Sequence, residues 1–139
     1  MRILAALFIV FFGVASGPSQ GMAQTSAGAQ IQTVIGQQIQ AFEADDFAAA
    51  FTFASPSIQR LFGGPERFGA MVRNGYPMVW RPSDVTFGEL REIEGAMWQK
   101  VIVRDQAGVP HVLDYRMVQV DEAWRISAVQ LLPSPDVAA

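Results

Sequence analysis

The last third of the chain alternates apolar and polar residues, which is the pattern of β-strands. Four stretches show it, at residues 85–92, 97–105, 111–120 and 124–132. Successive strand residues point to opposite faces of a sheet, and the short polar segments between these stretches are typical of turns. The pattern predicts a meander of four antiparallel strands.

The first half of the chain has apolar residues at three- and four-residue steps, which is the period of an amphipathic helix. The longest such stripe consists of Ile31, Val34, Ile35, Ile39 and Phe42. Shorter helices are predicted at residues 46–54, after the Ser55-Pro56 cap, and from Pro65 to a stop at Gly75. Helices followed by a meander predict an α+β domain in which the helices pack on one face of a curved sheet.

Residues 76–83 (YPMVWRPS) interrupt both patterns. Their two prolines remove backbone donors and favour extended backbone at the residues that precede them. We predict an ordered, extended connection here, with Tyr76 and Trp80 packed against the domain.

Strand parity assigns side chains to the two faces of the sheet. Leu113, Tyr115 and Met117 form an uncharged set and are predicted to face inward, whereas Asp114 and Arg116 face outward. In the last strand the more apolar set is Trp124, Ile126, Ala128 and Gln130. The inner surface is therefore expected to be apolar, with a few neutral polar groups. The candidate lining residues of an enclosed pocket are Gln38, Tyr76, Trp80, Gln99, Tyr115, Trp124 and Gln130.

Residues 1–23 have the composition of a secretory signal peptide. Arg2 supplies a positive start, residues 3–14 are apolar, and Gly21 and Ala23 are the small residues that favour cleavage. The apolar run is shorter than the roughly 20 residues of a membrane-spanning helix. We expect cleavage after Ala23 and a periplasmic or secreted protein without a stable membrane anchor. The rest divides into a flexible leader at 24–30, one domain at 31–133 and a loose tail at 134–139.

Composition makes several chemistries improbable. The chain has 10 basic and 13 acidic side chains, one histidine and no cysteine. A chain without a basic run is not expected to bind nucleic acid. With His111 as the single histidine, neither a metal site nor a nucleophilic triad is expected, and no cofactor motif is present.

Three segments carry a family resemblance: AFTFASPSIQRLFG, YPMVWRP and the ending WRI-x-x-VQLLP. They resemble the bacterial domain-of-unknown-function family 4864, over about residues 31–133. The family is uncharacterised in function, so the resemblance implies no catalytic residue. The order of elements also resembles, more loosely, the cystatin-like cone of nuclear transport factor 2, which implies helices that enclose a cavity against the sheet.

These features favour a non-catalytic binding module for a small apolar ligand, or for a partner protein that docks on the sheet. A cavity enzyme (lyase, isomerase or hydrolase) with Asp114 as general base is the second hypothesis. Parity argues against it, because Asp114 shares the outer face with Arg116 and a solvated ion pair explains both. A structural homodimer through the outer sheet face is the third. Its apolar contacts would be Val112, Val118, Val129 and Leu131.

Overall fold

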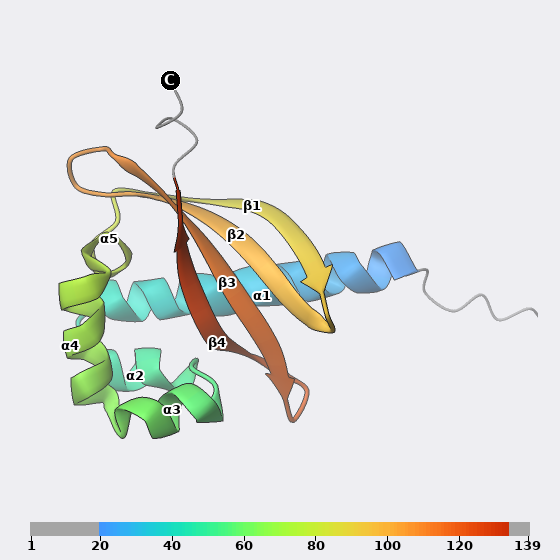
Figure 1. The fold of residues 1–139 in the computed structure, drawn as a ribbon, viewed down its shortest axis with the longest axis horizontal. Helices are drawn as coiled ribbons and strands as arrows, with labels where there is room; N and C mark the ends of the chain where they lie inside the picture. Colours follow the sequence, from blue (N-terminus) through green and yellow to red (C-terminus); the bar gives the residue numbers. More distant parts are fainter. Residues whose placement is uncertain (1–19, 134–139) are drawn as a thin grey trace, which may run out of the picture.

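The computed structural model describes residues 20–133 of the 139-residue chain. Within this range five helices precede four strands (Figure 1). The helices are α1 (Gln20–Glu43), α2 (Phe47–Thr52), α3 (Pro56–Phe62), α4 (Pro65–Gly75) and α5 (Pro77–Trp80). The strands are β1 (Asp84–Ile93), β2 (Ala96–Arg104), β3 (Pro110–Val120) and β4 (Ala123–Leu132). The α+β class is confirmed, and each strand boundary lies within one residue of its expected place.

The four strands form one open antiparallel sheet in the order β1-β2-β3-β4. Two-residue turns join β1 to β2 and β3 to β4. Glu94 and Gly95 in the first turn, and Asp121 and Glu122 in the second, all have positive φ. Turns of this kind match the twist of paired strands, which is why short polar segments are sufficient to build the meander.

The first helix is longer than the apolar stripe indicates. Residues 24–30, expected to be a flexible leader, belong to α1. Tertiary contacts hold this segment in place. The indole Nε1 of Trp124 donates to Gln30 Oε1 at 3.1 Å, and Gly28 lies close to the Leu90 side chain. Most of the expected signal peptide, residues 1–19, lies outside the described range, as does the expected tail.

The connection before the sheet is helical and not extended as expected. Pro77 occupies the first position of α5, where its missing N–H is not needed. The influence of a proline on the residue before it is visible at Tyr76, which precedes Pro77, and at Arg81, which precedes Pro82. Both have non-helical backbone, with φ −133° and φ −136°. Gly75 is the last residue of α4 and does not have the positive φ expected of a residue past the helix end.

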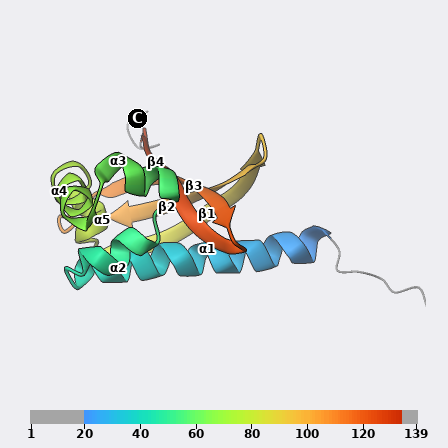
Figure 2. The ribbon, with the colours of Figure 1, turned by 90° about the horizontal axis from the view of Figure 1, so that it is seen from below.

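The helices cover one face of the sheet. Figure 1 shows α1 crossing the strands, and Figure 2 shows α2 to α5 gathered around the carboxyl end of α1. The segment between α2 and α3 is fastened to the edge of β4, because Ile126 N donates to Phe53 O and Ser55 N donates to Ile126 O. Ser55 also caps α3, as expected, with its hydroxyl accepting from Ile58 N.

The core fills the space between the helices and the inner face of the sheet. From α1 it takes Ile31, Ile35, Ile39 and Phe42, and from the strands Val101, Val103, Leu113, Tyr115, Met117 and Ile126. Phe68 of α4 is the centre of an aromatic cluster, with ring centroids 5.4–5.8 Å from those of Phe42, Phe51 and Phe62. Every buried strand residue on this face is uncharged.

A β-bulge reverses the faces of β4 halfway along the strand. Ile126 is opposite Met117, but beyond the bulge Val129 is opposite Tyr115 and Gln130 is opposite Asp114. One extra residue shifts the alternation by one position. The inward placement of Gln130 is therefore wrong, and so is the outward placement of Val129 and Leu131. Ala128, beside the bulge, still lines the hollow on the inner side that is described below.

The packing makes a matched prediction for two leucines that are opposite each other in the sheet. Leu113 is 0% exposed and Leu131 is 53% exposed. Replacing Leu113 by alanine should lower the free energy of unfolding by about 2–5 kcal/mol, because it leaves a cavity. Leu131→Ala should lower it by less than about 1 kcal/mol. Urea denaturation checks both values, and equal losses would contradict the difference in burial between these two positions of the inner face.

Candidate functional site

A cavity of about 280 Å³ lies between α3, α4 and the inner side of β4. Residues of α1, α5 and β3 complete its lining. Its side chains are apolar apart from two phenols, one amide and one hydroxyl. The lining consists of Gln38, Phe42, Ala54, Ile58, Leu61, Phe62, Phe68, Met71, Val72, Tyr76, Val79, Tyr115, Ile126, Ser127, Ala128 and Val129. No ionisable carboxylate or cation is among them, so the hollow is electrically neutral.

The wall formed by α3 is the part of the site that is most exposed to solvent. None of the α3 residues is buried, although Ile58, Leu61 and Phe62 all line the cavity. Leu61 is 71% exposed. A large apolar side chain that both lines a hollow and faces solvent marks the mouth of that hollow.

The polar groups of the cavity differ in whether they have hydrogen-bond partners. Gln38 Nε2 donates to Ala50 O at 3.1 Å, and the Tyr76 hydroxyl donates to Val129 O at 3.4 Å. The Tyr115 hydroxyl is buried and has no hydrogen-bond partner within the described residues. Burial, with a smaller contribution from nearby Tyr76, raises the pKa of Tyr115 well above its ordinary value. The hydroxyl therefore stays protonated.

Three of the residues expected from the sequence, Gln38, Tyr76 and Tyr115, meet in this cavity. Gln99 does not reach it, although it lies on the inner face opposite Tyr115. Its amide donates to Gly88 O and Lys100 O, both at 2.9 Å. Gly88 belongs to the irregular part of β1, so Gln99 satisfies a carbonyl beside a bulge. Its role here is structural.

The other three expected residues lie elsewhere. Trp80 donates to Asp45 and stacks under the Arg81 guanidinium, with 4.3 Å between its ring centroid and Arg81 Cζ. Trp124 bonds to α1 at the opposite end of β4, as described above. Gln130 faces outward because of the bulge. Aromatic and amide side chains are therefore poor markers of the cavity, because tertiary partners elsewhere in the fold can hold them.

Sequence reasoning missed most of the wall. The sequence predicts the two helices that carry Ile58, Leu61, Phe62 and Met71, but it does not mark these residues as a cavity wall. Val129 was assigned to the wrong face. The available signal was the Ser55-Pro56 cap, which fixes where α3 begins, but no residue type in α3 distinguishes a cavity wall from ordinary core.

Asp114 lies on the outer face, as parity predicts, but its surroundings differ from the expectation. Both of its carboxylate oxygens accept from Nη2 of Arg91, at 2.6 Å, and its side chain is only 9% exposed. The expected solvated pair with Arg116 is wrong, because Arg91 reaches across β2 and Arg116 instead donates to Ser127. Since Asp114 and Tyr115 are on opposite faces, Asp114 cannot act as a base in the cavity.

The outer face has a second, polar hollow of about 260 Å³ around Asp114. Its lining residues are Ile93, Glu94, Ala96, Trp98, Asp114, Arg116 and Gln130. Register places three more basic side chains on this face, at Lys100, Arg104 and Arg125. The two faces of the sheet therefore differ: the buried part of one is uncharged and covered by helices, and the other is rich in cations.

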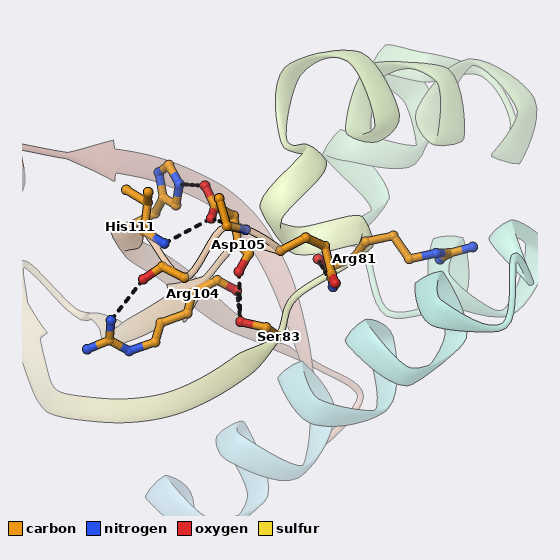
Figure 3. A network of polar contacts seen from close by, with 9 residues as sticks. Arg81, Ser83, Arg104, Asp105 and His111 are labelled. Carbon is orange, nitrogen blue, oxygen red and sulfur yellow. Dashed lines mark hydrogen bonds and ion pairs between the residues drawn. The ribbon is translucent and has the colours of Figure 1, made fainter.

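The single histidine belongs to a polar network that shapes the loop between β2 and β3 (Figure 3). Asp105 Oδ2 lies 2.9 Å from His111 Nε2, while Oδ1 accepts from the backbone N–H groups of Ala107 and Val109, both at 2.9 Å. The hydrogen bond with His111, followed by that from Val109, holds the pKa of Asp105 below its usual value. Among residues 20–133, no group of three or more histidine or acidic side chains is placed to hold a metal ion.

A family model matches residues 24–139 of the chain. The family is described as a domain of unknown function, DUF4864. The chain belongs to this family. The resemblance carried by the three sequence segments is thereby confirmed, and the match spans the cavity and the outer face alike. A search of the curated proteins found no match. In the part of the chain that the structure describes, no helix is long and apolar enough to cross a membrane.

The Asp105 network predicts a pH effect on stability. Because the pKa of Asp105 is lowered from 3.8 in the folded protein, its contribution is present above about pH 4 and is lost as the pH falls through the folded value. Asp105→Asn should make the loss of stability between about pH 4 and pH 2 shallower than in the wild type. Urea denaturation across this range measures the slope. Glu89→Gln, which removes an exposed carboxylate, is the control. An unchanged slope in Asp105→Asn would contradict the role assigned to Asp105.

Proposed function

We propose that this DUF4864 domain is a binding module for a small, uncharged and mostly apolar molecule, held in the cavity between α3, α4 and β4. The observation that carries the proposal is the uncharged lining of a hollow of about 280 Å³. Cavities of about 150 Å³ with apolar walls bind benzene, so the volume suits a molecule of one ring or slightly more. Binding is driven by removal of apolar surface from water.

The lining also excludes classes of ligand. A carboxylate or an ammonium group in the cavity would lose its hydration without gaining a charged partner, which is costly. The catalytic alternatives are disfavoured for the same reason, because an acid–base reaction needs an ionisable group where the substrate binds. Within the lining, the only titratable side chains are the phenols of Tyr76 and Tyr115.

Export remains part of the proposal. The family match begins at Gln24, the residue that would follow the expected cleavage after Ala23. The start of the family match and the expected end of the signal peptide therefore coincide, which supports a periplasmic or secreted binding module.

Toluene is a suitable first probe of the cavity. In NMR titrations of the wild type we expect saturable shifts of the methyl signals of Ile58, Met71 and Val129, with a dissociation constant of about 0.1–1 mM. Val129→Trp fills the cavity from β4 and should weaken binding at least about tenfold. Val112→Trp places the same side chain on the outer face of β3 and serves as the control.

Two results would overturn the proposed site. One is the absence of saturable cavity shifts with toluene in the folded wild type. The other is equal weakening by Val129→Trp and Val112→Trp, since the two positions lie on opposite faces of the sheet.

A second candidate function, docking of an acidic partner protein on the outer face, has a specific observation in its favour. Five of the chain's 10 basic side chains share that face, against three acidic ones, although the chain has a net charge of −3. The basic residues are Arg91, Lys100, Arg104, Arg116 and Arg125, and the acidic ones are Asp84, Glu94 and Asp114. Pairing two copies face to face would oppose like charges, and Val129 and Leu131 are missing from the face. An acidic partner thus fits better than a homodimer.

Poly-L-glutamate at low salt is a probe for this second candidate. Binding should decrease with added salt and should fall at least about tenfold in Lys100→Glu/Arg116→Glu. Arg60→Glu/Arg67→Glu changes the net charge equally on the helical side and should bind as the wild type does. Equal losses in the two double variants, or a stable dimer in sedimentation of the wild type, would contradict an acidic partner at this face.

A further inference from the structure

The Tyr115 hydroxyl is an exception among the buried polar groups of the cavity. Gln38 and Tyr76 both donate to backbone carbonyls, whereas Tyr115, which is 1% exposed, has no partner among the described residues. Buried polar groups in folded proteins are almost always hydrogen-bonded, and an isolated one calls for an explanation. A ligand that accepts a hydrogen bond would provide the missing partner.

We infer that Tyr115 selects the ligand of this cavity, and that the ligand is a neutral molecule with an accepting oxygen, such as a ketone, ester or ether, at its inner end. The inference rests on the proposed function and adds the chemical class to it. The apolar walls would hold the body of the molecule, and the Tyr115 hydroxyl would donate to its oxygen.

The environment of Tyr115 explains why the accepting group is neutral. A phenol has a single O–H donor, and burial keeps the pKa of Tyr115 high, so that the donor is retained at neutral pH. The same desolvation penalises a carboxylate placed beside it, because no cation lines the cavity. A neutral carbonyl or ether oxygen gains the hydrogen bond without this penalty.

The position of Tyr115 also determines how a ligand would reach its hydroxyl. The ring lies on β3, opposite Val129 of β4, and Tyr76 from the helical side is close enough to raise its pKa. Tyr115, Tyr76 and Val129 all line the cavity, and because the Tyr115 hydroxyl is buried we infer that it lies away from the exposed mouth at Leu61. An entering oxygen reaches it once the lining side chains shift. Met71 is the flexible side chain among them, and α3, which buries none of its residues, is the wall that moves most easily.

Acetophenone and ethylbenzene form a matched pair of probes, since they have nearly the same shape and differ in the ketone oxygen. Each is titrated by NMR into the wild type, Tyr115→Phe and Thr86→Val. Tyr115→Phe should weaken acetophenone about 5–10-fold and leave ethylbenzene within twofold. Comparing each ligand with itself across variants cancels the different hydration of the two ligands. Thr86→Val, which removes a hydroxyl from the outer face of β1, is the control and should leave both affinities within twofold.

The outcomes separate the two proposals. If Tyr115→Phe changes both affinities by the same factor, the donor role is wrong while the binding function stands. If neither probe produces saturable shifts at the cavity of the wild type, the binding function itself fails.

A second measurement needs no variant. The carbonyl stretching frequency of acetophenone bound to the wild type should be lower than in hydrocarbon solution, because a hydrogen bond weakens the C=O bond. A bound ketone with the hydrocarbon frequency would overturn the donor role even if Tyr115→Phe did not fold.

Discussion

The exclusion of charge from the inner face of the sheet is the constraint on which the rest of the structure depends. The apolar stripe of α1 and the phenylalanine cluster around Phe68 can pack on the strands only because that face presents no ionised side chain at the contact. Gln38 of α1 and Gln99 and Tyr115 of the sheet are the buried polar side chains at this contact, and the amide nitrogens of the two glutamines donate to backbone carbonyls. The third leaves a polar donor at the inner end of an apolar hollow, which is an arrangement suited to recognition.

Two irregularities in the sheet accompany this separation of an uncharged inner face from a charged outer face. The bulge in β4 turns Val129 toward the cavity and sends Gln130 to the outer face. The irregularity in β1 leaves Gly88 with a carbonyl that Gln99 satisfies. On the outer face, Asp114 is nearly buried but is neutralised by Arg91, so the one buried carboxylate of the described residues lies away from the cavity. Breaking such a pair is costly, which gives Arg91 a structural role distinct from that of its exposed basic neighbours.

The order of the elements could be predicted from the sequence, but part of the site could not. Alternation located all four strands, and parity placed Tyr115 inward because β3 is regular where it pairs with β2. Parity failed at Gln130, since a single extra residue reverses every later position and leaves no trace in composition. The helical state of residues 24–30 depends on contacts with Leu90 and Trp124, which lie far away in the sequence. The cavity wall on α3 was missed because nothing distinguishes it from core before the helices are assembled.

The ionisation of Tyr115 tests most directly whether the inner end of the cavity is neutral and free of water. The chain has two tyrosines, so a Tyr76→Phe variant leaves a single phenol to follow through its ring carbon signal in NMR. The Tyr115 signal should stay unchanged through about pH 10, where exposed tyrosines titrate, for as long as the amide spectrum remains that of the folded protein. Titration of Tyr115 near pH 10 in the folded protein would contradict the account.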